Sequence, residues 1–377
     1  MVNVRFWKGV FLLAGMIIGA GMFGIPYTFA GAGFWLGVFE LILLTGVIIG
    51  FHLAYGDIVL ATPVRHRLPG YIRLYLGPRA AAVSWGTALL GIFGALIAYI
   101  ALGANFLSTL LGLAGIDASV VLLGFVITLS GAALTRLSIA KEAAINAVLT
   151  VVLIAFILVL AVFLFPFFAP GNVSGIRVGR AFLPYGVLLF ALAGNTVIPD
   201  VISVLGRDRR RARRAIIIGT VLPAAVYFLF ALAVVGALGS GASKETIGGL
   251  SHLDGTIFIL TGVLIGFLAV YTSFIALSRS MQELFVLDFG LGRVWSWLVV
   301  SAAPFIFFLL GLRDFLMIIG AVGAIAVGID AGLVFAARRR IAKNGIPHAS
   351  VLSVVGYALI YLLILAGIVM EILKIIQ

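Results

Sequence analysis

Residues 15–27 read GMIIGAGMFGIPY and lie inside an apolar segment that runs from about residue 6 to residue 30. Four glycines fall within ten residues here, and Pro26 follows them. Glycine lowers the cost of leaving helical geometry, and proline removes a backbone donor. Close helix packing through Gly15 and Gly19 would explain two of these glycines but not the whole pattern. The stretch therefore predicts a helix that is unwound near its middle.

The same residues contain a G-x-G-x-x-G pattern, which also occurs in dinucleotide-binding folds. That motif needs a preceding strand and a soluble βαβ unit, whereas here it lies within an apolar run. The whole chain is apolar, since 63% of its 377 residues are hydrophobic and 10% are charged. A soluble protein has about 25% charged residues. Lipid must therefore cover most of the surface, and runs this long predict spanning helices rather than a barrel.

Eleven apolar spans follow one another, with no soluble domain or linker between them. They lie near 6–30, 34–56, 80–112, 117–135, 143–168, 181–206, 214–238, 253–279, 294–311, 315–337 and 350–373. All but five of the 25 Lys and Arg residues then fall on one side, which marks that side as cytoplasmic. We expect a multi-pass protein of the cell membrane with its N-terminus in the cytoplasm and its C-terminus outside. The five exceptions are Arg177, Arg180, Lys244, Arg313 and Lys374.

Two of the cytoplasmic segments are especially basic. The run at 207–214 reads RDRRRARR and is interpreted as a topology signal, with binding of anionic lipid as the alternative. Segment 63–79 mixes basic and aromatic residues, which predicts a short amphipathic stretch along the cytoplasmic interface.

A second interruption occurs in the sixth span, where residues 190–200 read FALAGNTVIPD. Spans one and six are corresponding members of two five-span halves, and such odd halves have opposite membrane orientations. Paired interruptions at these positions are typical of inverted-repeat transporters. The sequence predicts one transmembrane domain, with a first repeat at about 5–168, a second at about 180–338 and an extra helix at about 350–373.

Broken helices expose backbone polar groups, which are tolerated at membrane depth only beside protein or a water-filled cavity. Free N–H groups at the start of the second half favour a carboxylate, and free carbonyls at the end of the first half favour an ammonium or a metal cation. A zwitterionic amino acid matches both ends. The absence of charged side chains from residues 9–39 fits such a site.

The sequence IIGAGMFGIPY at 17–27 resembles the amino acid/auxin permease family and its bacterial relatives, the hydroxy/aromatic amino acid permeases, within the amino acid–polyamine–organocation superfamily. LPGYIRLYLG at 68–77 and the region of Thr272 and Ser273 are also similar to that family. The likeness covers roughly residues 5–340. It implies the all-α fold of the bacterial leucine transporter, with eleven transmembrane helices in a 5+5 inverted repeat, broken helices one and six, and one extra C-terminal helix.

The resemblance also implies roles for residues at the two breaks. Gly19, Ala20 and Gly21 would bracket the substrate carboxylate, and Ile17 would offer a carbonyl oxygen to the amine. Tyr99 would donate its hydroxyl to the carboxylate, unless it is simply a packed aromatic residue. The remaining residues of the implied substrate site are Phe23, Phe190, Ala191, Ala193 and Asn195.

Sodium-coupled and proton-coupled members both occur among these relatives. The sodium site common in this fold would take carbonyls from Gly15, Ile18 and Ala269 and hydroxyls from Thr272 and Ser273. Those hydroxyls could instead bond back to their own helix. We expect one sodium ion at most as the coupling ion, with a proton as the alternative, and no other metal or cofactor.

Three acidic residues lie at membrane depth, where a charge is costly and therefore suggests function. Asp200 follows Pro199 at the start of the second half of span six, where it would be a cap, a gate or a proton relay. Asp330 is expected to pair with a cytoplasmic arginine, and Glu40 is a further candidate for gating or proton transfer. The chain has four scattered histidines and no cysteine, which excludes thiol chemistry and argues against a metalloenzyme.

These patterns predict a secondary active symporter rather than an enzyme. It would move a neutral, hydrophobic or aromatic L-amino acid by alternating access, because small Ala191, Ala193 and Gly194 leave room for a large side chain. A proton-coupled symporter is the first alternative. A sensor that binds an amino acid without moving it is the second.

Overall fold

The computed structural model describes residues 2–136, 139–245, 256–343 and 354–376, and these ranges are helical with no strand. The first span consists of α1 (Val2–Ile17), the short 3-10 segment η1 (Ala20–Gly24) and α2 (Ile25–Ala32). The sixth consists of α8 (Leu183–Leu192), η5 (Asn195–Val197) and α9 (Ile198–Val204). The other helices are α3 (Phe34–Ala61), α4 (Leu68–Leu76), α5 (Pro78–Leu113), α6 (Val120–Leu134), α7 (Ile139–Leu164), α10 (Arg209–Leu238), α11 (Thr256–Asp288), α12 (Arg293–Leu309), α13 (Phe315–Ala321), α14 (Gly328–Lys343) and α15 (Val354–Ile376).

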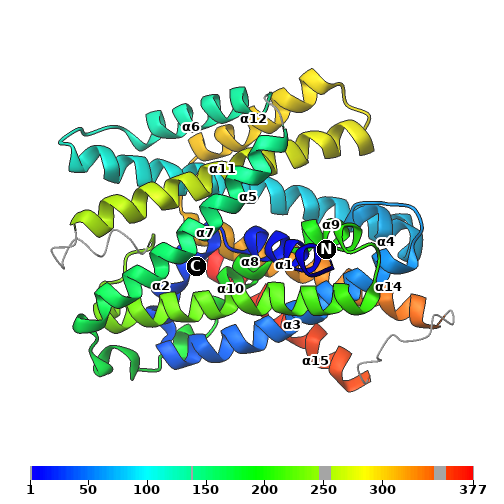
Figure 1. The fold of residues 1–377 in the computed structure, drawn as a ribbon, viewed down its shortest axis with the longest axis horizontal. Helices are drawn as coiled ribbons and strands as arrows, with labels where there is room; N and C mark the ends of the chain where they lie inside the picture. The colour runs from blue at the N-terminus through cyan, green and yellow to red at the C-terminus, as the bar shows by residue number, and fades with distance from the viewer. Residues whose placement is uncertain (1, 137–138, 246–255, 344–353, 377) are drawn as a thin grey trace.

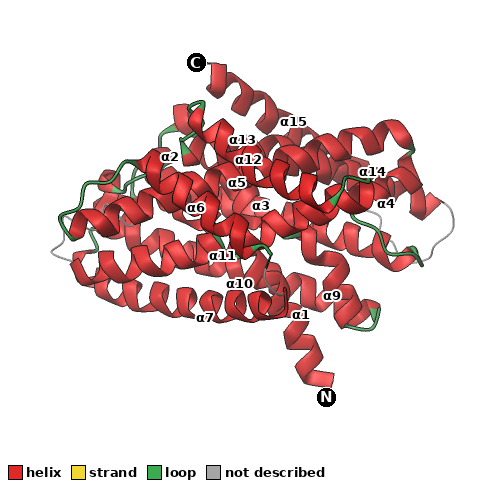
Figure 2. Cartoon of the chain, turned by 90° about the horizontal axis from the view of Figure 1, so that it is seen from above, coloured by secondary structure: helices red, strands yellow, loops and turns green. Residues whose placement is uncertain are grey.

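The two interrupted spans lie in the middle of the bundle. α1 and α8 are placed between the helices α5, α6, α11 and α12 on one side and α3 and α10 on the other (Figure 1). The first turns of α1 project from the body, and α15 lies on the opposite side (Figure 2). The breaks are therefore surrounded by protein. An unwound backbone at membrane depth needs this, because lipid offers its polar groups no hydrogen-bond partner.

The helix positions agree with the predicted spans. Seven helices are long and apolar enough to cross a membrane, and the bent pair of α1 with η1–α2 makes an eighth. Three shorter apolar helices, Val120–Leu134, Arg293–Leu309 and Tyr361–Leu373, lie where the remaining spans were predicted. The all-α prediction is confirmed, whereas eleven crossings stay a prediction. Segment 63–79 contains α4, which packs against α5 and α14.

Prolines mark the starts of the second half-helices. Pro26 lies in the first turn of α2, and Pro199 lies in the first turn of α9. Proline is favoured there because its missing N–H has no partner within the helix and its φ angle already suits a helix. The same residues that interrupt each span therefore also restart it.

One carboxylate holds the ends of three helices together. Asp57 of α3 accepts from Arg209 at 3.2 Å, lies 3.5 Å from Arg213 of the same helix, α10, and accepts from Arg338 of α14 at 3.0 Å. Arg207 donates to carbonyls in the last turn of α3 and just beyond it. Part of the basic run at 207–214 therefore has a structural role in fixing helix ends.

Span ten, formed by α13 and α14, is also interrupted, and glycines bring it against α8. A π-helical segment (Val322–Val327) separates α13 from α14, and a side chain on Gly323 would strike the backbone of Gly186 and Phe190. Irregular turns of this kind occur often at functional sites. Here the missing side chains let span six and span ten approach closely.

Replacing Gly323 by alanine should destabilise the protein by about 2 kcal/mol or more, because the new methyl group overpacks a backbone contact. Gly46 of α3 is the control, since a side chain there meets nothing within 4 Å and alanine suits a helix better. Unfolding in detergent measures both variants. Equal stability of Gly323→Ala and Gly46→Ala would contradict the packing described here.

Candidate substrate site at the two broken helices

The first break is an extended residue followed by a tight turn. Gly19 has φ −151° and ψ −155°, and the axes on its two sides are bent by 47°. The last helical hydrogen bond before it runs from Ile18 N–H to Ala14 at 2.8 Å, and Gly19 itself accepts from Met22 at 3.3 Å. Gly15 and Ile18 carbonyls receive no backbone hydrogen bond from the described residues. The predicted unwinding is confirmed.

The second break faces the first. α8 ends at Leu192, and Ala193 is extended with φ −68° and ψ 118°. A side chain on Gly21 would lie 2.8 Å from the Cα atom of Ala191, so the two backbones touch at this point. Only glycine permits this approach, which brings the end of one half-helix against the start of another.

A histidine binds the free backbone of the second break. The N–H of Gly194 donates to Nε2 of His52 at 3.2 Å, and His52 Nδ1 lies 3.1 Å from the hydroxyl of Thr220. Thr220 donates its own proton to Ile216 at 2.9 Å, so its hydroxyl oxygen accepts from Nδ1–H. His52 is therefore neutral, with its proton on Nδ1, and completely buried.

A tyrosine hydroxyl lies between the two breaks. Tyr227 of α10 places its hydroxyl oxygen 2.6 Å from the Ile17 carbonyl and 3.0 Å from the Ala191 carbonyl. Sequence reasoning did not select Tyr227 or Thr220, because single polar residues in a long apolar helix have no visible partner. Their spacing of seven residues, which puts both on one face of a helix, was the available signal.

All of the predicted substrate residues except Tyr99 of α5 lie at the two breaks or in the turns next to them. Ala20, Gly21, Phe23 and Ala191 are buried. Partly exposed are Phe190, Ala193, Asn195 and Tyr99.

Tyr99 of α5 has its hydroxyl free for a further partner. Its side chain is partly exposed. The hydroxyl makes no hydrogen bond to the described residues, which fits a role toward a bound molecule.

Aromatic rings surround Phe23 just beyond the first break. Its ring meets Phe106 edge-to-face at 5.2 Å and Phe230 at 6.4 Å. A side chain on Gly266 of α11 would lie 3.0 Å from Phe23, so α11 closes the cluster. Such rings favour an aromatic or large apolar side chain in contact with them.

The residues predicted to bind sodium lie on two helices that share a neighbour. Gly15 faces Thr150 of α7, and α11 packs against α7 and η1. The Thr272 hydroxyl is within bonding distance of Leu268 and Ala269 carbonyls at 3.0 and 3.1 Å, and Ser273 donates to Ala269 at 2.8 Å. Both hydroxyls thus bond to their own helix, which is the alternative that the sequence left open.

Asp200 is held by two arginines of the segment between α3 and α4. It forms an ion pair with Arg65 and lies 3.7 Å from Arg67, which also donates to the Thr196 carbonyl at 3.3 Å. The segment therefore fastens both the second break and the start of α9. This placement suits the predicted gate.

The other two acidic residues lie apart from this contact. Asp330 accepts a hydrogen bond of 2.5 Å from Thr87 of α5 and makes no ion pair in the described ranges, so the predicted arginine partner is wrong. Arg338, about two turns further along α14, pairs with Asp57 instead. Glu40 lies near Tyr185 and has one buried oxygen without a partner in the described chain.

A second ion pair closes the end of the bundle where α13 begins. Lys244 lies 2.5 Å from Asp314, the N-cap of α13, and Asn105 of α5 donates to Glu245 at 3.1 Å. The hydrogen bond to Asp314 raises the pKa of Lys244. Burial works to raise the pKa of Asp314, but hydrogen bonds from Lys244 and the Met317 N–H outweigh it and lower that pKa. The pair is therefore charged at neutral pH.

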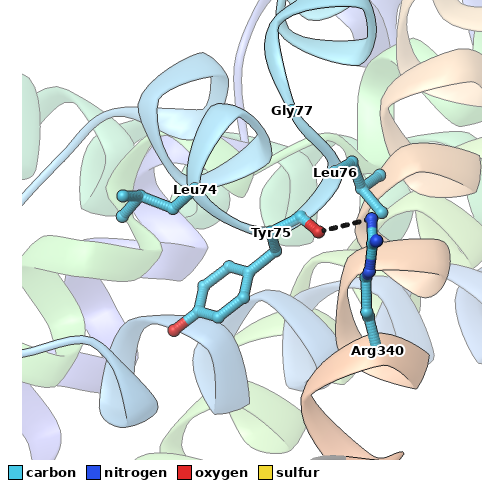
Figure 3. Close-up of a pocket in the computed structure, with 5 residues that line it drawn as sticks. All are labelled: Leu74, Tyr75, Leu76, Gly77 and Arg340. Atoms are coloured by element: carbon cyan, nitrogen blue, oxygen red, sulfur yellow. Dashed lines mark hydrogen bonds between the residues drawn. The ribbon is translucent and has the colours of Figure 1, made fainter.

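A surface hollow lies elsewhere, where α4 meets α14. Its lining is Leu74, Tyr75, Leu76, Gly77 and Arg340, and Arg340 donates to the Tyr75 carbonyl at 3.1 Å (Figure 3). None of these residues belongs to either break, so the hollow is separate from the candidate site.

The sequence profile of the tryptophan/tyrosine permease family matches residues 3–374, and the chain belongs to this family. It is therefore a membrane transporter rather than an enzyme. Among its relatives, tyrosine-specific transport system 1 of Haemophilus influenzae is 26% identical over 356 residues, which cover 87% of each chain. The low affinity tryptophan permease of Escherichia coli K12 is 24% identical over 366 residues, which cover 89% of this chain and 88% of the relative.

A solved structure shares the fold. The crystal structure of MhsT in complex with L-phenylalanine matches with a TM-score of 0.67 and 13% identity, and the match covers 97% of both chains. The predicted leucine-transporter-type fold is thereby confirmed. The predicted membership of the amino acid/auxin permease family stays a prediction.

Replacing His52 by phenylalanine should cost about 1–3 kcal/mol of stability, because the buried Gly194 N–H loses its acceptor. His52→Gln should cost less, since an amide oxygen can take the place of Nε2. Thr45→Val on the same helix is the control, because its hydroxyl bonds only to Leu41. Unfolding in detergent gives the three values, and a His52→Phe value no larger than the control would argue against the contact.

Removing the charge of Asp200 should make the end of the bundle at α9 open more often. The chain has no cysteine, so Thr196→Cys in the second break is a clean reporter of thiol labelling. An exposed ion pair is worth about 1 kcal/mol or less, so Asp200→Asn should speed labelling by up to about fivefold. Arg211→Gln, which breaks a surface pair with Asp208, should leave the rate unchanged. Equal labelling rates in the two variants would show that Asp200 does not help to hold this end of the bundle closed.

Proposed function

We propose that this permease carries a neutral aromatic L-amino acid, such as tryptophan or tyrosine, across the membrane by alternating access. The observation that supports this proposal most is the close backbone contact between Gly21 in η1, just after the first break, and Ala191 in the last turn of α8, just before the second break. Free carbonyls at one end and N–H groups at the other suit a zwitterion. The printed substrates of the relatives, tyrosine and tryptophan, fit the aromatic surroundings of Phe23.

The proposed substrate contacts keep to the residues at the breaks. The carboxylate would meet N–H groups of η1 at Gly19, Ala20 and Gly21 and the free hydroxyl of Tyr99. The amine would meet carbonyls at the end of α1, where Ile17 already accepts from Tyr227 and keeps a second lone pair. The side chain would lie against Phe23, Phe190, Ala191, Ala193 and Asn195.

Sodium is the proposed coupling ion. The Gly15 and Ile18 carbonyls, which lack backbone partners among the described residues, support an ion site next to α7. Neutral oxygens of this kind suit a hard monovalent cation. Thr272 and Ser273 would complete the site only by turning their hydroxyl lone pairs toward the ion while still donating to α11.

A proton is the second candidate, and Asp330 favours it. This carboxylate is buried and bound to Thr87, and the neighbouring Ser84 hydroxyl is buried with no partner in the described chain. An acid at membrane depth that is held by one hydroxyl group and no cation can exist in a protonated form. Asp330 is therefore the residue through which a proton-coupled cycle would act.

Uptake into proteoliposomes separates the two coupling ions. We expect L-tryptophan or L-tyrosine to accumulate under a sodium gradient. The double variant Thr272→Ala, Ser273→Ala removes two proposed ligands and should lower that uptake about tenfold or more. Thr261→Ala is the control on the same helix, because its hydroxyl bonds to Ile257 near the helix start.

Uptake that is driven by a pH gradient alone and is lost in Asp330→Asn would show that the coupling ion is a proton and not sodium. Binding without accumulation under either gradient would identify a sensor instead. Uptake of neither amino acid, with no binding of either, would contradict the proposed function.

The membrane arrangement completes the proposal. The protein would lie in the cell membrane, with its N-terminus in the cytoplasm and its C-terminus outside. It would contain repeats at about 5–168 and 180–338 and an extra helix at about 350–373. Asp200 with Arg65 would be part of the cytoplasmic gate, and Glu40 would act in gating or proton transfer from the outer half. The proposal also places the chain in the amino acid–polyamine–organocation superfamily.

A further inference from the structure

One helix supplies the polar contacts of both breaks. Thr220 and Tyr227 are seven residues apart on α10, so both project from the same face. Thr220 reaches the second break through His52, which accepts from Gly194. Tyr227 bonds to the first break at Ile17 and to the second at Ala191.

The Tyr227 contact is unusual because two acceptors share one donor. Ile17 is the last residue of α1, and Ala191 lies in the last turn of α8. Each carbonyl therefore lies at the negative end of a half-helix dipole. A phenol has a single O–H proton, so it satisfies the two carbonyls by sharing or by alternating between them.

This contact is buried away from solvent. Tyr227 is fully buried, and Ile17 and Ala191 are each no more than 3% exposed. Without the hydroxyl, two carbonyls with like partial charges would face each other in apolar surroundings. Such buried, unpaired acceptors are costly, so the half-helices would move apart or admit another donor.

We propose that Tyr227 is a positioning residue whose hydroxyl fastens the two broken helices together beside the proposed substrate site. This inference rests on the proposed transport function only for the part played by the substrate. The ammonium group of an amino acid carries three donors, so it can take over both carbonyls from the single phenol proton. Tyr227 would then hold the site ready when it is empty and yield its acceptors when the substrate arrives.

A cysteine reporter tests the fastening without any transport measurement. Val197, partly exposed in η5, is replaced by cysteine in this cysteine-free chain, and its reaction with N-ethylmaleimide is timed. Tyr227→Phe should speed labelling of the empty protein about tenfold, the change expected from losing one hydrogen bond. Tyr185→Phe is the matched control, because its hydroxyl bonds to the Leu363 carbonyl away from the breaks.

Two further readouts distinguish a positioning role from a merely structural one. Saturating L-tryptophan should return the Tyr227→Phe rate to that of the unmodified position, and the KM for uptake should rise while the maximal rate changes little. 4-Aminophenylalanine at position 227 restores an N–H donor and should restore slow labelling. Should Tyr227→Phe not fold, 3-fluorotyrosine at the same position, a stronger donor of nearly equal size, should slow labelling below the unmodified rate.

The outcomes separate this inference from the proposed function. Equal labelling rates in Tyr227→Phe and Tyr185→Phe, or an unchanged rate with 3-fluorotyrosine, would overturn the fastening. Faster labelling of Tyr227→Phe that no amino acid reverses would leave the fastening intact and count against the amino acid site.

Discussion

An unwound backbone in the middle of a lipid-covered bundle needs a hydrogen-bond partner for every polar group, and the centre of this structure follows from that need. The glycines of the first span let the chain leave the helix, and Gly21 lets it touch Ala191 of the sixth span. His52 then takes the N–H of Gly194, and Tyr227 takes a carbonyl from each break. The Gly15 and Ile18 carbonyls, which accept no backbone hydrogen bond from the described residues, mark where a ligand can bind.

Charged side chains act at the two ends of the bundle rather than at its centre. Asp200 with Arg65 and Arg67 fastens the second half of span six, and Lys244 with Asp314 fastens the start of span ten. Exposed pairs of this kind contribute little to stability and therefore open at small cost. Under the proposed alternating access, contacts of this strength at the ends would let the centre open to each side in turn. The contacts at the breaks are buried in apolar surroundings, where the loss of a hydrogen bond costs more.

Glycine and proline content predicted the breaks because backbone freedom is a local property of those residues. Apolar run length predicted the spans for the same local reason, and α4 was recognisable from its mixture of basic and aromatic residues. The partners of single polar residues were not predictable in this way. His52 and Gly194 are 142 residues apart, and Tyr227 and Ile17 are 210 apart, so only the packing of the fold brings them together. The wrong partner for Asp330 has the same origin, since Thr87 of a distant span occupies that position.

The central claim is that an amino acid binds between the two breaks, and a structure of the protein with bound L-tryptophan tests it most directly. The account predicts the ammonium group within hydrogen-bonding distance of carbonyls at the end of α1, the carboxylate at the N–H groups of η1, and the indole ring beside Phe23. Tryptophan bound elsewhere, for example in the hollow between α4 and α14, or a continuous helix through Gly19 in the bound state, would contradict it.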